Sequence, residues 1–341
     1  MFLTRGCPCA ALQTTLPQVK LYLTWIQWLV YCKVVTEDTI WINIDETPMS
    51  RIMKSRAGYM AKGVPKQRAS PRCEHKVSSG HLKQQCSLMG AICSDPALQQ
   101  HWPQVFMPRT LGAQKDWMCF PKDHHHPSLR IILGGTGWTT SEIWKIYLDE
   151  LLTEVQHHVP LNRIALVWDA YDAHLGVPII KSLIAKNIPI VVVPGGMTWL
   201  LQVLDTRVFA DVKRCLANRL AQARAHSATG NIDVTTWIEV AFETVTKTLI
   251  HAQPQNHFPQ HGCSTSLNSL SWRLQDFAHG VTGKHCVPMT ESQLQVYVGR
   301  KKAGLWHAIM PIKWRLKAHE RIRYKVGEGP ITRSASRRSL A

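Results

Sequence analysis

The sequence is short of acidic residues. Only 23 aspartate and glutamate side chains stand against 40 lysine and arginine side chains among 341 residues, which gives a formal net charge of +17 at pH 7. Because an excess of positive charge attracts polyanions, this balance favours a polyanionic partner, most simply nucleic acid. A soluble protein that is basic without having such a partner remains the alternative.

Long hydrophobic runs and paired cysteine motifs are also lacking. An apolar stretch at residues 21–32 is too short to span a bilayer, and it lacks the small-residue cleavage site of a signal peptide. The ten cysteines show neither the spacing of a zinc finger nor the density of a disulfide scaffold. We therefore expect no membrane contact, and cysteines that are mostly reduced and structural, as in an intracellular compartment.

Apolar patterning predicts alternating strands and helices after a loose leader at residues 1 to about 17. The expected strands are 39–44, 85–92, 104–107, 130–133, 164–168 and 188–193. The expected helices are about 18–33, 141–155 capped by Thr139 or Thr140, 178–186, a long helix from near Thr198, and one within 230–252. The strand–helix–strand unit at 164–193 has continuously apolar strands, which is typical of buried parallel pairing.

A basic segment lies at residues 51–76. It carries eight lysine or arginine residues against one acid, and glycines and prolines interrupt it, so we expect a loop or hairpin. Its cations suit the phosphates of a DNA backbone, with a solvated hairpin as the alternative. The residues that we assign to DNA contact are Arg51, Lys54, Arg56, Lys62, Lys66 and Arg68.

Three aspartates occupy positions that suit a metal centre. Asp45 and Asp169 each close a hydrophobic strand, and Asp205 follows at a helical position. A carboxylate at the end of a buried strand is unfavourable unless it has a partner, and a divalent cation is a common one. Three such groups suit one or two Mg²⁺ ions, and a two-metal centre favours in-line displacement at phosphorus.

Each of these acids also has a structural interpretation. Aspartate is common in turns and caps, and only the order and spacing of the three together favour a site. Glu46 follows Asp45 in a strand and should point to the opposite face, so we favour a structural role for it. Asp172 is expected to cap the next helix. His174 is expected either near the site or a DNA phosphate, or at a helix start or in packing.

Three sequence blocks resemble the DDE superfamily endonuclease domain, as in pogo/jerky and mariner-like transposases. Residues 44–48, Ile-Asp-Glu-Thr-Pro, look like its first catalytic block. Residues 167–174, Val-Trp-Asp-Ala-Tyr-Asp-Ala-His, look like the second. Residues 193–205, which end in Thr-Trp-Leu-Leu-Gln-Val-Leu-Asp, look like the third.

The resemblance covers about residues 36–220 and implies an RNase H-like fold. It implies that Asp45, Asp169 and Asp205 bind Mg²⁺ or Mn²⁺, with Asp45 shared between two ions. The sequence departs from the family pattern in three places. Val203 stands where the family has proline, two glycines replace a more polar pair at 195–196, and no full-length DNA-binding region precedes the blocks.

We therefore expect an α/β protein with an RNase H-like mixed sheet flanked by helices and a helical, basic C-terminal extension. The expected parts are a leader and packing helix at 1–35, an endonuclease domain at 36–220, a helical extension at 221–299 and a basic, partly disordered tail at 300–341. The expected function is that of a nuclear, transposase-derived DNA endonuclease and strand transferase, which could act as a homodimer on DNA ends. The alternative is a catalytically inactive DNA-binding protein derived from a transposase.

Overall fold

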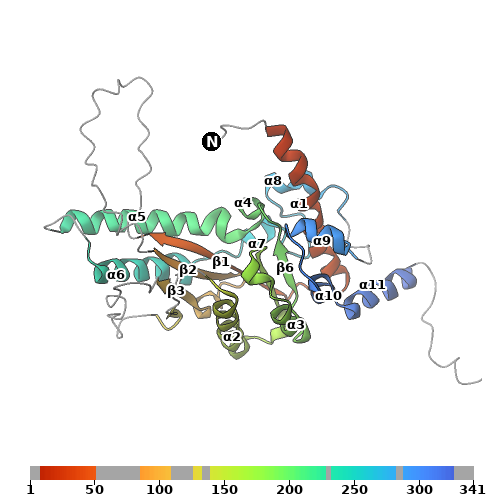
Figure 1. Cartoon of the computed structure of the whole chain (residues 1–341), viewed down its shortest axis with the longest axis horizontal. Coiled ribbons are helices and arrows are strands. Elements are labelled where there is room, and N and C mark those ends of the chain that lie inside the picture. The colour runs from red at the N-terminus through yellow and green to blue at the C-terminus, as the bar shows by residue number, and fades with distance from the viewer. Residues whose placement is uncertain are drawn as a thin grey trace, which may run out of the picture. The chain divides into compact units, whose positions relative to one another are not determined.

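A mixed β-sheet forms the centre of the computed structural model, which describes residues 8–50, 85–108, 126–132, 139–227, 232–281 and 287–325 (Figure 1). The six strands are β1 Ile40–Ser50, β2 Gln85–Cys93, β3 Gln104–Pro108, β4 Leu129–Ile131, β5 Ile164–Asp169 and β6 Ile190–Val193. Their order in the sheet is β4-β3-β2-β1-β5-β6. The pairs β1–β2 and β2–β3 are antiparallel, whereas β3–β4 and β5–β6 are parallel.

Helices flank this sheet. The α-helices are α1 Pro8–Tyr31, α2 Ser141–His158, α3 Val177–Ala185, α4 Thr198–Leu201, α5 Phe209–His226, α6 Val234–Val245, α7 His257–Gln260, α8 Trp272–Ala278, α9 Glu291–Tyr297, α10 Leu305–Ile309 and α11 Ile312–Lys325. Short turns are η3 Gln99–His101, η5 Leu161–Arg163 and η6 Asp172–Leu175, with π-helical turns at η7 Leu204–Val208 and η8 Thr246–Ile250. The α/β class, with a six-stranded mixed sheet between helices as in RNase H-like folds, is thus confirmed.

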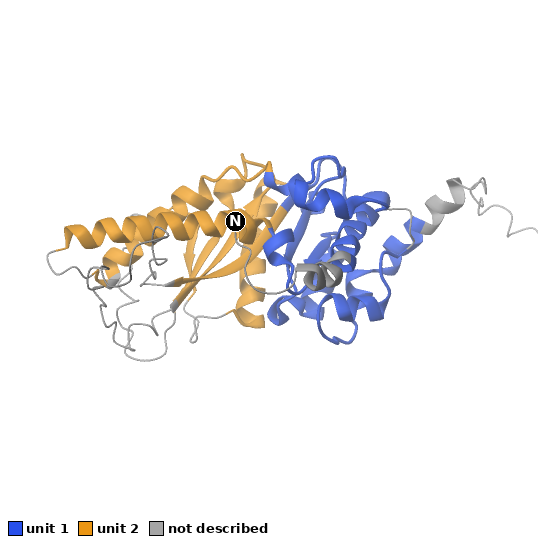
Figure 2. Cartoon of the chain, turned by 90° about the horizontal axis from the view of Figure 1, so that it is seen from above, with its two compact units in different colours: residues 1–41, 161–202, 257–341 blue, residues 42–160, 203–256 orange. Residues whose placement is uncertain are grey.

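The chain forms two compact units, each built from separated segments (Figure 2). Unit 1 comprises residues 1–41, 161–202 and 257–341, and unit 2 comprises residues 42–160 and 203–256. Unit 1 therefore holds β5 and β6, and unit 2 holds β2, β3, β4 and nearly all of β1. The expected domain boundaries follow the chain in order and stay a prediction.

In unit 2, different helices cover the two faces of the sheet. Phe106 of β3 packs against Phe242 of α6, with ring centroids 4.7 Å apart. Helices α5 and α6 lie side by side and are joined by an ion pair of 2.7 Å between Arg219 and Glu243 (Figure 1). On the other face, Thr139 just before α2 donates a hydrogen bond to Glu46 of β1. Because side chains alternate along a strand, odd- and even-numbered residues of β1 meet different helices.

In unit 1, the apolar helix α1 is part of the core. Trp25 packs edge-on against Tyr297 with ring centroids 6.1 Å apart, and Trp28 packs against Trp314 at 6.5 Å. The Tyr297 hydroxyl then donates to the carbonyl of Val192 in β6 at 2.7 Å. Each buried large apolar side chain contributes about 1.5–3 kcal/mol by leaving water. Helices α1, α9 and α11 therefore pack in the same core of unit 1, although they lie far apart in the chain.

Two predicted boundaries are wrong. Residues 1 to about 17 were expected as a loose leader; residues 1–7 lie outside the described residues, but α1 begins at Pro8 and contains Pro17. A single long helix was expected from Thr198, but α4 ends at Leu201 and Gln202 has the extended angles φ −97° and ψ 119°. The chain turns helical again at Val203 and passes through η7 before α5 begins. One extended residue thus divides the expected helix, and η7 carries Asp205.

Candidate active site

Asp45 lies on the face of β1 that α5 covers. Asn43, Asp45 and Thr47, which we call the β1 face, are all buried and share this side of the strand. Asp45 pairs with Gly90 of β2, and a side-chain carbon at Gly90 would lie only 3.1 Å from the ring of Phe209 in α5. The missing side chain at Gly90 therefore lets the start of α5 approach the strand beside Asp45.

Asn43 joins the β1 face directly to the turn that carries Asp205. Its side-chain oxygen accepts a hydrogen bond of 2.9 Å from the backbone N–H of Leu204, and both residues are fully buried. Asp205 is the next residue and is exposed, while Leu204 anchors the turn in the core. Irregular π-helical turns such as η7 are frequent at functional sites. Within unit 2, β1, which holds Asp45, and η7, which holds Asp205, are therefore joined by a hydrogen bond.

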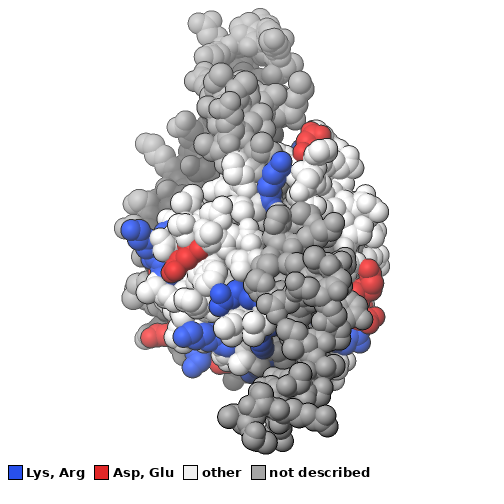
Figure 3. Space-filling model, turned by 90° about the vertical axis from the view of Figure 1, so that its right-hand side faces the viewer, with Lys and Arg blue, Asp and Glu red and all other residues white. Residues whose placement is uncertain are grey.

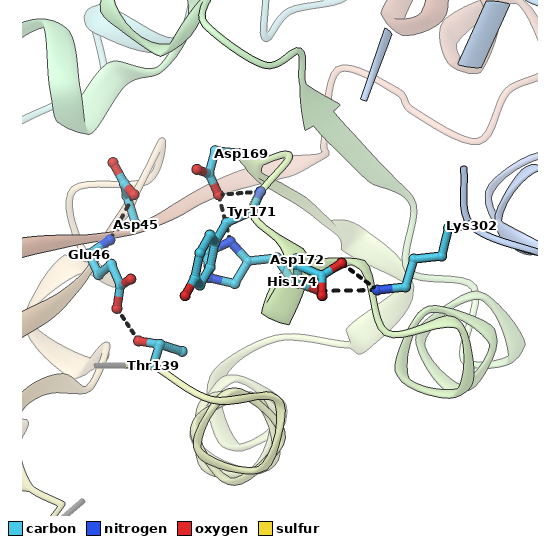
Figure 4. Close-up of polar contacts among 8 residues, drawn as sticks. All are labelled: Asp45, Glu46, Thr139, Asp169, Tyr171, Asp172, His174 and Lys302. Atoms are coloured by element: carbon cyan, nitrogen blue, oxygen red, sulfur yellow. Dashed lines mark hydrogen bonds and ion pairs between the residues drawn. The ribbon is translucent and has the colours of Figure 1, made fainter. Parts of the chain in front are cut away.

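Asp169 is held by residues that follow it closely in the chain. Its Oδ1 atom accepts the backbone N–H of Tyr171 at 3.2 Å and lies 2.6 Å from Nδ1 of His174 (Figure 4). Since an ionised carboxylate only accepts, Nδ1 of His174 carries the proton. The side chain of His174 is 1% exposed and that of Asp169 is 26% exposed. His174 therefore combines a contact to Asp169 with a buried, packed position, and a role at the site stays a prediction.

Asp172 binds cations rather than capping η6. Its carboxylate lies 3.0 Å from the Arg300 guanidinium and 3.1 Å from the Lys302 ammonium. Neither η6 nor the next helix α3 has a side-chain cap, so the expected capping role is wrong. Hydrogen bonds from Lys302 and Arg300 lower the pKa of Asp172 below its ordinary value. Asp172 is therefore ionised at neutral pH and draws both cations to the turn after Asp169.

Glu46 points away from Asp45, as strand alternation predicts. Its carboxylate accepts a hydrogen bond from the Thr139 hydroxyl, and Figure 4 shows the two side chains facing each other. The Glu46 backbone N–H in turn donates to Oδ1 of Asp45 at 2.7 Å. Glu46 therefore links β1 to the start of α2, which is the structural role expected for it.

The oxygen donors of the three aspartates suit a hard divalent cation. At Asp169 both hydrogen bonds go to Oδ1, so Oδ2 is available to a cation. A histidine behind a ligating carboxylate is a common support of metal ligands. Within the described residues, however, no three His, Cys, Asp or Glu side chains gather closely enough to hold a metal ion. The chemistry of the donors therefore fits Mg²⁺ or Mn²⁺, and the shared site stays a proposal.

The predicted DNA contacts Arg51, Lys54, Arg56, Lys62, Lys66 and Arg68 lie outside the described residues. Elsewhere the basic character is visible at the surface, where lysine and arginine side chains gather in the lower half of the view in Figure 3. None of the helices in the described part of the chain is long and apolar enough to cross a membrane.

Three residues of this region were not predicted from the sequence. Asn43 stands two positions before Asp45, which puts it on the same strand face, and this spacing was a usable signal. Tyr171 and Trp199 lie within the second and third blocks and are exposed, with 41% and 57% of the residue accessible. An aromatic residue within a catalytic block gives no sign of its exposure in the sequence alone.

Comparison with known proteins gives one family match. Residues 104–253 match the family model described as DDE superfamily endonuclease. Residues 104–253 are therefore similar to a DDE superfamily endonuclease domain, a family that suggests a transposase-like nuclease. Asp169 and Asp205 lie inside the matched segment and Asp45 precedes it. Neither a curated protein nor a solved structure matches the chain.

Proposed function

We propose that this protein is a transposase-derived, metal-dependent DNA endonuclease and strand transferase that uses Asp45, Asp169 and Asp205. The observation that carries the proposal is the position of Asp169 and Asp205 within the matched segment. Asp169 ends β5, and Asp205 lies in the turn η7, whose Leu204 is hydrogen-bonded to Asn43. These positions support the strand-end and helical acids that the resemblance implies.

The protein's residues have separate roles in this proposal. Asp45, Asp169 and Asp205 would hold Mg²⁺ or Mn²⁺, which when bound supplies Lewis acidity at phosphorus and acidifies an attacking water. His174 keeps the Asp169 carboxylate in one orientation through its Nδ1 proton. Water attacks the phosphodiester first and releases a 3′ hydroxyl. That hydroxyl then attacks a phosphodiester of target DNA, and the bond from phosphorus to the target's 3′ oxygen breaks, which leaves a 3′ hydroxyl on the target strand. Positive charge on the protein neutralises phosphates and holds the substrate.

The same proposal includes a nuclear location, because genomic DNA is the substrate, and a homodimer that holds two DNA ends. Neither follows from the contacts within one chain. Size-exclusion chromatography with light scattering, in the presence and absence of end DNA, measures the second of these directly.

A cleavage assay on transposon-end DNA with Mg²⁺ or Mn²⁺ tests the activity. We expect nicking by the wild type and none by Asp169→Asn, because the amide lacks the charge of the carboxylate. Asp211→Asn is the matched control, since Asp211 is exposed on α5 and pairs only with Arg214 among the contacts seen here. Nicking by Asp169→Asn at the wild-type rate would contradict the assignment.

A catalytically inactive DNA-binding protein is the second candidate. It is favoured by the lack of a three-ligand metal cluster in the part of the chain that the structure describes. This candidate predicts salt-dependent DNA binding, with a slope set by the number of phosphates contacted, and no nicking at any Mg²⁺ or Mn²⁺ concentration.

A further inference from the structure

Unit 1 displays two aromatic side chains at one edge of its paired strands. Strands β5 and β6 are parallel, and Asp169 stands opposite Val193 at their carboxyl ends. The segments that leave these two ends therefore emerge from the same edge of the sheet. Tyr171 follows the first end by two residues, and Trp199 lies in α4 after the second. We call Asp169, Tyr171, Asp172 and Trp199 the β5–β6 edge.

Both aromatic rings are held at this edge by neighbours that are buried. Tyr171 donates its backbone N–H to Asp169, and its ring packs edge-on against buried His174 with centroids 5.3 Å apart. Trp199 is followed in α4 by Leu200 and Leu201, which are 6% and 0% exposed. The two anchors fix the backbone under each ring while 41% of Tyr171 and 57% of Trp199 remain accessible.

Cations lie at the same edge. Arg300 and Lys302 reach Asp172, the residue after Tyr171, at 3.0 and 3.1 Å (Figure 4 shows Lys302). Their side chains remain 38% and 26% exposed. Single exposed aromatics are ordinary on protein surfaces. Here, two exposed aromatics follow the two strand ends, and two cations reach the residue after Tyr171. Rings and cations are the side chains that bind single-stranded nucleic acid, in which bases stack on rings and phosphates meet positive charge.

We propose that Tyr171 and Trp199 form a stacking surface for unpaired nucleobases at the end of a bound DNA. The inference deepens the proposed function and rests on it for the identity of the polymer as DNA. Bases at a duplex end unstack more readily than internal ones, and stacking on a ring replaces the contact that they lose. Arg300 and Lys302 would meet the phosphates of the same nucleotides.

The test compares two DNAs in chelator without divalent metal. One is a labelled blunt duplex, and the other is the same duplex with a single-stranded overhang of about four nucleotides. Fluorescence anisotropy with the full chain gives both affinities. Trp199→Ala should weaken overhang binding about 5- to 150-fold, the range for loss of one stacked base, and blunt-duplex binding by less than about twofold. Tyr171→Ala should act in the same direction.

Matched variants separate stacking from other causes. Trp199→Phe keeps a ring and should retain most of the overhang affinity. Trp272→Ala removes a tryptophan of the same unit that is 75% exposed but lies in α8, and it should change neither affinity. Far-UV circular dichroism and a thermal melt verify folding. If Trp199→Ala does not fold, Tyr171→Ala and Trp199→Phe carry the comparison.

The inference is overturned if Trp199→Ala and Tyr171→Ala leave overhang binding unchanged, or if they weaken both DNAs equally. A change of oligomeric state with unchanged DNA affinity would assign the rings to a protein contact instead, and would equally overturn it. Failure of the proposed function looks different: a protein that binds overhangs through Trp199 but never nicks DNA keeps the inference and loses the endonuclease. A protein that nicks DNA but shows no preference for overhangs keeps the endonuclease and loses the inference.

Discussion

At the β5–β6 edge, Asp169 is held by residues two and five positions further along the chain, whereas on the β1 face Asn43 joins a turn that lies 161 residues away. The first arrangement is formed by one short segment as it folds. The second exists only after β1 and η7 have come together in unit 2. Two carboxylates of one proposed centre can therefore be positioned in different ways, one by neighbours in the chain and the other by a contact between distant segments. Mutations of the supporting residues distinguish these two ways.

The largest effect is expected where a proposed ligand itself is changed. Asp205→Asn should reduce DNA nicking more than about 100-fold, because loss of a ligand should exceed the 10- to 100-fold that loss of a ligand's support brings. Single-turnover cleavage measures it, with Asp211→Asn as control on α5. Equal rates for the two variants would remove Asp205 from the site and leave the β1 face without a catalytic partner in η7.

The next effect should come from the support of Asp169. His174→Ala removes the Nδ1 donor at 2.6 Å and should lower Mn²⁺ affinity or cleavage about 10- to 100-fold. His174→Asn can place an amide N–H near the same point and should restore most of the loss. Calorimetric titration with Mn²⁺ measures the affinity directly and does not require DNA cleavage. If His174→Asn is as defective as His174→Ala, the role is packing rather than orientation.

Asn43→Ala should lower the stability of the fold, because the Asn43 side chain joins β1 to a distant turn. The change leaves the Leu204 N–H buried without its acceptor, at a cost of about 1–3 kcal/mol in the free energy of unfolding. Urea unfolding measures it, and the exposed residue Asn268 gives a control, Asn268→Ala, expected within about 0.5 kcal/mol of wild type. Two variants of equal stability would mean that the bond between β1 and η7 contributes little.

The smallest effect is expected at Asp172. Lys302→Ala should raise the pKa of Asp172 toward its ordinary value, because Lys302 is the main cause of its lowering. Since the folded-state pKa lies below the unfolded value, these ion pairs stabilise the fold above the unfolded pKa and lose that effect as pH falls through the folded pKa. The exposed pair should change stability by less than about 1 kcal/mol. Carboxyl NMR titration checks the shift, and an unchanged pKa would mean that Arg300 alone sets it.

Much of the fold was predictable because its signals are local. The apolar runs of β5 and β6 predicted parallel pairing, and Thr140 caps α2 as one of the two expected residues. The second block placed Asp169 at a strand end, where the structure has it. These features depend on neighbours in the chain, so periodicity and capping chemistry suffice to find them.

The rest depended on contacts between distant residues or on exceptions to local rules. A loose leader was expected up to about residue 17, yet α1 begins at Pro8 and continues through Pro17, although proline disfavours helix interiors. Gln202 carries no helix-breaking chemistry, and its extended conformation accompanies the bond between Leu204 and Asn43. No short-range pattern contains that bond, which is why the helix was predicted to run unbroken through Asp205.

The central claim is that Asp45, Asp169 and Asp205 bind the same metal centre, and the most direct measurement is anomalous X-ray scattering from crystals grown with Mn²⁺. The account predicts an anomalous peak in contact with carboxylate oxygens of all three residues, and the loss of that peak in Asp169→Asn. A peak that contacts at most one of the three, or carboxylates too far apart to share ions that sit about 3.5–4 Å from each other, would contradict it.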